Sequence, residues 1–230
     1  MIVQSPESLI DWSEIIATGT QAGEFLQGQL TQDVLQCDLA PQWSLVLSPT
    51  SEIVGLLFVT KLASGYSIVV ESADAEKVLT RLRRFVLRVD VEFSRKDGIE
   101  GPFRTLAERI EAGMPASAEF STEVLPHAFG KDFVSKTISF SKGCFTGQEL
   151  VGRLDARGSN VPWRFVHFVA PNLEIATNAL RLSGPATTSG PTTVISSPTG
   201  VEGLAIVHRS LLGEELAVNI NGTQIAIVNS

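Results

Sequence analysis

Residues whose types can do chemistry are concentrated in one short segment of the chain, positions 142–153. The segment places a cation two residues before a thiol, and an amide next to a carboxylate. Because a thiolate is favoured near positive charge, the thiol is a candidate nucleophile, redox centre or metal ligand. Glycines on both sides of the thiol allow a tight backbone that approaches a ligand closely. The residues concerned are Lys142, Gly143, Cys144, Gly147, Gln148, Glu149 and Arg153.

The chemistry of Cys144 depends on the local backbone. Glu149 and Arg153 are four residues apart, a spacing that pairs opposite charges on a helix. If Ser141 caps such a helix, backbone N–H groups lie near Cys144, a setting that favours the thiolate. The opposing interpretation is a small buried residue, because free cysteines are among the most buried residue types. The residues alone leave both interpretations open.

No other catalytic or metal-binding pattern stands out. The three histidines, His127, His167 and His208, are scattered, and a lone histidine is usually structural. Neither Cys37 nor Cys144 belongs to a CxxC pair or a Cys/His cluster with zinc spacing, so we expect free thiols and no resident metal. An iron–sulfur cluster normally needs several thiolates, so any cluster here needs ligands from elsewhere.

Periodic apolar residues and turn signals predict the elements that carry this segment. Thr20 is a candidate N-cap for the first helix, and Arg81, Arg83, Arg84 and Arg88 cluster near the end of the second. Cations are favoured at a helix C-terminus, so these arginines form either a solvated helix end or an edge that faces an anion. The predicted elements are a helix over 20–36, strands over 44–47, 54–60 and 66–70, a helix over 73–87, a strand over 89–94 and a short helix over 106–113.

The composition changes after Arg153. Residues 163–230 are rich in Val, Ile, Thr and Gly, and Asn221-Gly222 is a two-residue hairpin signal. These features predict an antiparallel β-barrel or sandwich at the C-terminus. We place the domain boundary between 1–158 and 159–230. The predicted strands cover 163–170, 179–182, 192–196, 203–208, 216–220 and 224–228.

Bulk properties exclude several classes of protein. The chain has 230 residues, 43% of them hydrophobic, which supplies a core for one large or two small domains. The net charge of −7 argues against a direct nucleic-acid binder and against binding to anionic membranes. The sequence starts without the basic region and apolar run of a signal peptide, so we expect a cytoplasmic protein.

Residues 142–153, KGCFTGQELVGR, resemble the K-G-C-F/Y-x-G-Q-E-x-x-x-R signature of the YgfZ family, whose members are related to the T-protein (aminomethyltransferase) of the glycine cleavage system. Residues 25–34, FLQGQLTQDV, are similar to the N-terminal FLQGQLTxDV segment of that family. Residues 109–115, RIEAGMP, resemble its R-I/L-E-A-G segment, and Leu125-Pro126 with residues 138–140 match the lead-in to the signature.

The resemblance implies an α+β fold with a T-protein-like folate-binding region and a C-terminal antiparallel β-barrel. It implies a ligand, tetrahydrofolate or a one-carbon derivative, with Glu111 at the pterin ring. It further implies a role in iron–sulfur cluster assembly or repair, with an indirect effect on tRNA modification, and partners among iron–sulfur enzymes or cluster-assembly proteins. Cys144 and Lys142 would carry that role. The remaining folate-binding candidates are Arg109, Gln148, Glu149 and Arg153.

Two departures from the family shape the alternatives. The chain is shorter than typical members between the arginine-rich helix and Glu111, which predicts a reduced folate pocket. The catalytic Asp of T-proteins has no counterpart that can be placed here, so we do not expect glycine-cleavage activity. A folate-dependent aminomethyltransferase and a binding module that has lost folate are the alternatives to an accessory protein.

Overall fold

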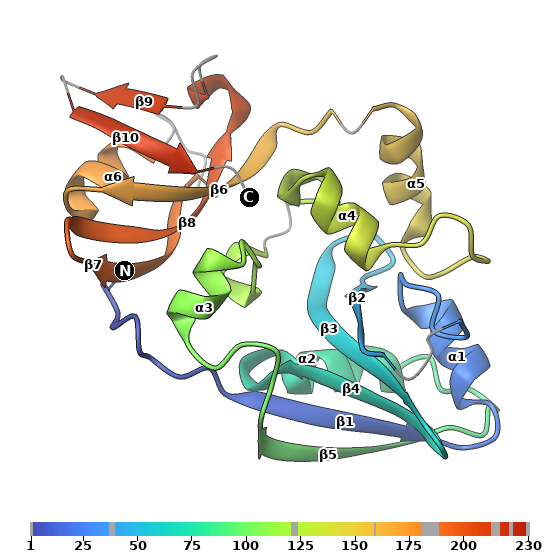
Figure 1. Cartoon of the computed structure of the whole chain (residues 1–230). Coiled ribbons are helices and arrows are strands. Elements are labelled where there is room, and N and C mark those ends of the chain that lie inside the picture. The colour runs from blue at the N-terminus through green and yellow to red at the C-terminus, as the bar shows by residue number, and fades with distance from the viewer. Residues whose placement is uncertain are drawn as a thin grey trace.

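The computed structural model describes residues 2–36, 40–120, 124–158, 160–180, 189–212, 217–220 and 223–228. Two five-stranded antiparallel sheets lie on either side of a central group of short helices (Figure 1). The order of layers is two helices, the first sheet, the central helices, the second sheet and one last helix. The α+β class predicted from the sequence is confirmed.

The first sheet has the strand order β2-β3-β4-β1-β5. Alternate residues of β3 face opposite ways, so that Leu57 and Val59 pack under α1 and α2 while Leu56 packs against the central core. The predicted strands over 44–47, 54–60 and 66–70 are confirmed, and β1 was not predicted. The elements are β1 (Trp12–Thr18), α1 (Ala22–Gln29), β2 (Gln42–Leu47), β3 (Ile53–Leu62), β4 (Gly65–Glu71), α2 (Ser72–Arg83) and β5 (Glu92–Ile99).

The first helix is shorter than predicted. It ends at Gln29 rather than near position 36, and Leu30 already pairs with Val46 of β2. Thr20 is not its N-cap, because the backbone N–H and the hydroxyl of Thr20 both donate to Asp90 Oδ2, at 2.8 and 2.6 Å. The apolar residues of 30–34 therefore pack as a turn, which the helical spacing did not reveal.

The central helices cover the other face of the first sheet. Thr105 and Glu108 form a capping box that starts α3, so the short helix predicted over 106–113 is confirmed up to Glu111. Aromatic rings of Phe129, Phe133 and Phe165 pack against each other at the centre of this core. The elements are α3 (Leu106–Glu111), η1 (Ser117–Glu119), η2 (Pro126–Phe129), α4 (Lys131–Thr137) and α5 (Gln148–Ala156).

The second sheet has the strand order β7-β8-β6-β10-β9. Ile220 pairs with Thr223 across the predicted hairpin, whose turn residues 221–222 lie outside the described residues. Within the described chain β7 and β9 are the two edges and do not pair, so the structure shows a sheet and not a closed barrel. The elements are β6 (Trp163–Ala170), α6 (Leu173–Leu180), β7 (Gly190–Ser197), β8 (Gly200–His208), η3 (Arg209–Leu211), β9 (Ala217–Ile220) and β10 (Thr223–Val228).

The prediction of a strand over 179–182 was wrong. Ala179 and Leu180 close helix α6, and residues 181–188 lie outside the described residues. Ala176, Ala179 and Leu180 recur at helical spacing and are buried against the second sheet, while Asn172 Oδ1 accepts the N–H of Ile175 at the start of the helix. The β-rich composition around this segment masked a short amphipathic helix.

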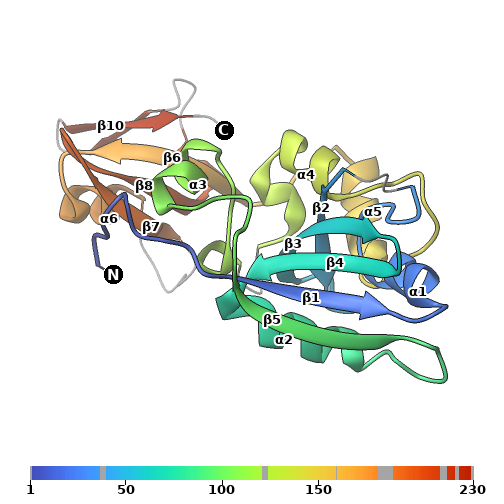
Figure 2. The same ribbon diagram turned by 60° about the horizontal axis from the view of Figure 1, so that its bottom comes forward.

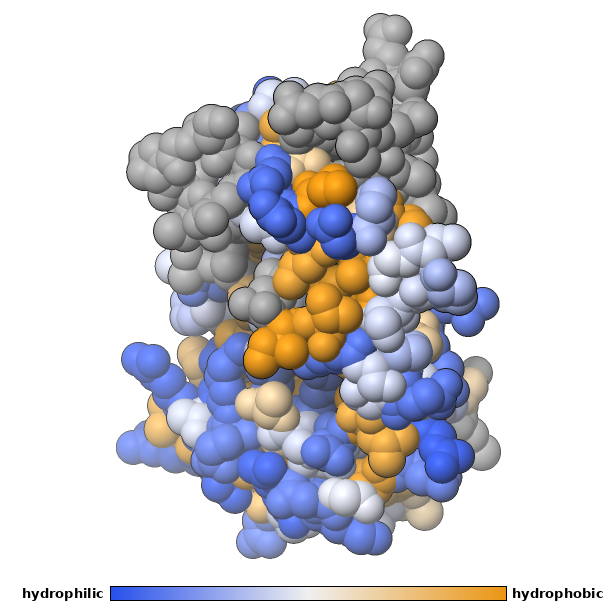
Figure 3. Space-filling model, turned by 90° about the vertical axis from the view of Figure 1, so that its left-hand side faces the viewer, coloured by the Kyte–Doolittle hydropathy of each residue, from blue (hydrophilic) through white to orange (hydrophobic). Residues whose placement is uncertain are grey.

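The N-terminal segment ties the two sheets together. Gln4 exchanges backbone hydrogen bonds with Val194 and Ser196 of β7, and Leu106 of α3 donates to the carbonyl of Ser8 (Figure 2). The central core also contains residues from both sides of the domain boundary that we predicted at position 158. That domain boundary stays a prediction. Apolar side chains gather at mid-height of the face that carries β7 and the N-terminus (Figure 3). Among the described helices none is long and apolar enough to cross a membrane.

Candidate functional site

The signature loop, residues 142–147, is fixed to the C-terminal end of α1 by Lys142. Its Nζ donates to the carbonyl oxygens of Gln27 at 2.6 Å and Leu30 at 2.7 Å. A third bond, 3.0 Å long, goes to the carbonyl of Gln32. The last carbonyls of a helix lack partners within the helix, so an ammonium group is well suited to this position.

Lys142 is a buried anchor of the loop, and its predicted part in cluster chemistry stays a prediction. Its side chain is only 8% exposed, and burial lowers its pKa to about 8 while Asp33 opposes the shift. Because all three of its N–H bonds go to backbone carbonyls, Lys142 does not donate a hydrogen bond to Cys144. Lys142 joins the signature to the N-terminal motif, residues 25–34. That motif resembles the same family independently of the signature.

The residues that follow Lys142 in the signature loop are also held in place, by packing and by hydrogen bonds. Phe145 is buried in the central core, and the N–H of Thr146 donates to the Gly28 carbonyl at 3.0 Å. Gly147 has a φ of +83°, and a Cβ there would lie 2.6 Å from the carbonyl oxygen of Ser48. The backbone at Gly147 thus requires glycine, both for its conformation and for its packing.

One of the clustered arginines supports this docking. Arg81 Nε donates to the carbonyl of Leu47 at 2.9 Å, and its Nη1 donates to Gln29 Oε1 at 3.0 Å. The same Gln29 oxygen accepts the hydroxyl of Thr146 at 3.3 Å. Arg81 is buried and lies over the ring of Phe85, so it is part of the protein interior rather than a solvated helix end.

Cys144 is an exposed free thiol between these fixed neighbours. The alternative of a buried structural cysteine is therefore wrong. The predicted helix start was also wrong, because α5 begins at Gln148 and the hydroxyl of Ser141 pairs with Ser139 instead of capping it. The thiol stands four residues before the helix, on a loop whose backbone is pinned at Lys142, Phe145 and Thr146.

The polar residues of α5 have separate roles. Gln148 Oε1 accepts the N–H of Phe145 at 3.4 Å, which closes the turn before the helix. Glu149 and Arg153 form the ion pair predicted from their spacing, with an N···O distance of 2.7 Å. Both side chains are largely exposed, so the pair contributes little stability and stays accessible to a partner.

Arg109 lies at the junction of the two sheets. It is 4% exposed, and its Nη1 lies 3.2 Å from Glu119 Oε2 while its Nη2 donates to Thr193 Oγ1 of β7 at 3.1 Å. Glu71 lies 3.8 Å from Arg109 Nε. Burial raises the pKa of Glu71, and the charge of Arg109 opposes that shift. Arg109 is thus committed to an internal ion-pair network.

Glu111 lies two residues further on and is exposed at the end of α3. Among the described residues it has no hydrogen-bond or ion-pair partner. Figures 1 and 2 both show α3 and α5 apart, with α4 between them. The five residues predicted to bind folate therefore do not form one site: Arg109 and Glu111 lie on α3, and Gln148, Glu149 and Arg153 lie on α5.

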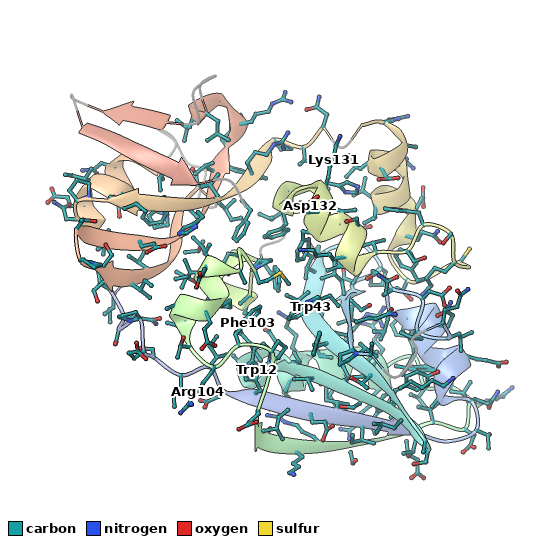
Figure 4. All side chains as sticks on the ribbon, viewed as in Figure 1. Trp12, Trp43, Phe103, Arg104, Lys131 and Asp132 are labelled. Atoms are coloured by element: carbon teal, nitrogen blue, oxygen red, sulfur yellow. The ribbon has the colours of Figure 1, made fainter. Side chains whose placement is uncertain are left out.

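A groove next to Glu111 was not predicted from the sequence. Its volume is about 260 Å³, and one wall is the backbone of 112–114 that directly follows Glu111. The other wall is α4, which contributes Lys131, Asp132 and Lys136. Lys131 and Asp132 are labelled at the start of α4 in Figure 4. No residue motif marks these lysines in the sequence, because only the fold brings α4 opposite the end of α3.

Three aromatic side chains, Trp12, Trp43 and Phe103, form a cluster between the first sheet and α3 (Figure 4). Trp12 Nε1 donates to the carbonyl of Phe103 at 2.7 Å, and the rings of Trp43 and Phe103 stack 5.9 Å apart. The space left among them is about 10 Å³, which is room for about one water molecule. This cluster is therefore packed interior and not an open ligand site.

No protein-family model matches the chain. A tRNA-modifying protein YgfZ of Enterobacter sp. (strain 638) is 26% identical over 223 residues, which cover 66% of this chain and 68% of that relative. An uncharacterized protein of Haemophilus influenzae is 28% identical over 208 residues, covering 73% of this chain and 74% of the relative. These matches agree with the complete signature over 142–153. The chain is thus similar to the YgfZ proteins in its signature and over about two thirds of its length.

A solved structure shares the fold of this chain. A glycine cleavage system aminomethyltransferase T from Bartonella henselae superposes with a TM-score of 0.67, covering 97% of this chain and 86% of that one. The sequences are 14% identical, so this likeness concerns the fold alone. Within that fold the YgfZ signature forms a pinned loop with one exposed thiol. No group of three or more potential metal-ligating side chains lies together in the described part of the chain.

Proposed function

We propose that this chain is a folate-binding accessory protein that supports the assembly or repair of iron–sulfur clusters and, through them, tRNA modification. The observation that carries the proposal is the exposed Cys144 on a loop that Lys142, Phe145 and Thr146 hold in place. A thiol presented in this way is accessible to a partner protein without any rearrangement of the loop. The printed name of the curated relatives, tRNA-modifying protein, agrees with this role.

A cluster needs several ligands, and the described residues offer one thiol at this loop, so a cluster is a substrate shared with a client protein rather than a resident cofactor. Glu149 and Arg153 lie on the exposed face of the helix that follows. Their charges would orient a client at this surface, since complementary charges at an interface chiefly set orientation and specificity.

The groove beside Glu111 fits the chemistry of folate. A carboxylate accepts paired hydrogen bonds from a 2-amino group and the neighbouring ring N–H of a pterin. Glu111 is exposed and unpaired among the described residues, so it is available for this contact. Lys131 and Lys136 on the opposite wall suit the carboxylates at the other end of folate. Of the residues predicted to bind folate, Glu111 alone keeps that role in the proposal.

Calorimetric titration with 5-formyltetrahydrofolate tests the folate half of the proposal. We expect Glu111→Gln to weaken binding by roughly 1–3 kcal/mol, the cost of a lost hydrogen bond to a charged group. Glu92→Gln, which removes one exposed carboxylate on β5, is the matched control and should bind like the wild type. If the wild type does not bind at millimolar folate, the chain is a binding module that has lost folate. Transfer of an aminomethyl group to the bound folate would instead favour the transferase alternative.

A further inference from the structure

A cavity to which we have assigned no role lies on the far side of α4 from Glu111. Its volume is about 570 Å³, within the roughly 300–1,000 Å³ that is typical of small-molecule sites. The wall is made by η2, α4, the end of α5 and the start of β6. Lys131, labelled in Figure 4 at the start of α4, borders both this cavity and the groove beside Glu111.

A buried histidine in this wall has no hydrogen-bond partner. His127 is 4% exposed, and neither Nδ1 nor Nε2 is hydrogen-bonded within the described part of the chain. Buried polar groups in native proteins nearly always have a partner, so an imidazole with two bare nitrogens indicates a missing hydrogen-bonding group. Burial lowers the pKa of His127, with the charge of Asp155 acting against it, so the ring is neutral near pH 7 and offers one donor and one acceptor.

The charges around the cavity favour an anion. Lys131 and Arg164 are the cations that line it, and Asp155 is its carboxylate. Burial lowers the pKa of Arg164, and the positive charge of Arg209 lowers it further. Arg164 Nη1 is used by the carbonyls of Val161 and Trp163, which leaves its other N–H groups for a ligand. This is a locally positive site on a chain whose net charge is −7.

The same cavity has an apolar side. Phe140 and Val134 line it, and Phe140 is an aromatic side chain with 38% of its surface exposed. An exposed aromatic ring next to cations suits a ligand that combines a flat ring with an anionic group. Ser135 adds a hydroxyl on the same helix as Lys131.

We propose that this cavity is a binding site for a small organic carboxylate, with its ring against Phe140, its carboxylate between Lys131 and Arg164, and a hydrogen bond to His127. The proposal does not require the folate function, because it rests on a different cavity and on residues that the proposed pterin contact does not use. Gly130 and Lys131 border both cavities.

Histidine ring NMR tests the site directly, because the chain has three histidines. The probe is p-aminobenzoyl-glutamate, added at millimolar concentration to protein labelled with ¹⁵N-histidine, and the His127 signals are assigned by their loss in His127→Asn. We expect the His127 ring signals to move and saturate, while those of half-buried His208 stay fixed. Arg164→Gln should weaken binding about tenfold, as expected for a lost charge-assisted hydrogen bond. Lys61→Gln, at the exposed end of β3, is the matched control and should leave the affinity unchanged.

Competition with 5-formyltetrahydrofolate separates two sources of the carboxylate. If folate displaces the probe from the wild type and less effectively from Glu111→Gln, the carboxylate belongs to the tail of a folate that reaches both cavities. If folate does not displace the probe, the site serves a separate carboxylate. His127 signals that stay fixed throughout the titration, or binding that is equally strong in Arg164→Gln, would overturn the proposal.

Discussion

The ammonium group of Lys142 lies 2.6 Å from the carbonyl oxygen of Gln27, a contact that joins two motifs 115 residues apart in the chain. Each motif resembles the YgfZ family by itself, and the structure explains why the two occur together. The N-terminal motif ends a helix whose last carbonyls need donors, and the signature supplies an ammonium group. The exposed thiol two residues later is positioned by this contact.

Replacing Lys142 with Met removes the donors and leaves the carbonyls of Gln27 and Leu30 buried without partners. We expect the free energy of unfolding to fall by roughly 1–3 kcal/mol, the cost of an unpaired buried acceptor. Urea denaturation measures it. Lys61→Met on the exposed end of β3 is the control and should stay within about 0.5 kcal/mol of the wild type. Equal losses in the two variants would show that Lys142 anchors nothing.

Gly147→Ala should loosen the signature loop. The positive φ of Gly147 and the Ser48 carbonyl 2.6 Å from the position of a Cβ both oppose a side chain there. The expected loss of stability is roughly 1–3 kcal/mol. Gly152→Ala, inside α5 with open space around its Cβ, should instead be neutral or stabilising by up to about 1 kcal/mol. Thermal unfolding of both variants checks this, and a stable Gly147→Ala protein would refute the tight docking.

Arg109→Met should be among the most damaging substitutions in the chain. It leaves the fully buried carboxylate of Glu119 without its counter-charge, which typically costs about 3–5 kcal/mol. Because Arg109 also reaches Thr193, the loss should loosen the contact between η1 and β7. Arg104→Met, on an exposed side chain five residues earlier, should have little effect. Protease sensitivity and denaturant unfolding distinguish the two variants.

The stability of the protein should depend on the ionisation of Glu71. Burial raises the pKa of Glu71 in the folded protein, whereas an unfolded glutamate titrates at about 4.3. Between these two pKa values the folded state binds more protons, so the free energy of unfolding falls as the pH rises through this window. Glu71→Gln should flatten this part of the pH profile and make the protein more stable than the wild type at neutral pH. Glu92→Gln should keep the wild-type slope, and an unchanged slope in Glu71→Gln would contradict the buried carboxylate.

Local patterns in the sequence predicted those features that local interactions determine. The strands of the first sheet over 44–47, 54–60 and 66–70 and the ion pair between Glu149 and Arg153 follow from residues close in the chain. The start of α5 was not predicted correctly, because Gly147 in the left-handed region ends the loop and the hydroxyl of Ser141 pairs with Ser139. Helix α6 was missed because its flanks are rich in β-forming residues.

The sequence named candidate site residues, whose roles stay predictions, and it did not give their geometry. The signature identified Cys144 and Lys142, but the family likeness could not show that the lysine faces inward to α1 while the thiol faces solvent. Arg109 and Glu111 lie two residues apart in the motif, yet one is buried in an ion-pair network and the other is exposed. Long-range packing decided each of these outcomes, including the groove that Lys131 and Lys136 share with the end of α3.

Complementation with Cys144→Ser tests the central claim most directly. The variant changes one sulfur to oxygen at an exposed position, so its melting temperature should match that of the wild type. In a bacterial strain that lacks its own YgfZ, we expect wild-type protein and the neighbouring control Ser141→Ala to restore the activity of iron–sulfur enzymes, and Cys144→Ser to fail. Full restoration by Cys144→Ser would contradict the account.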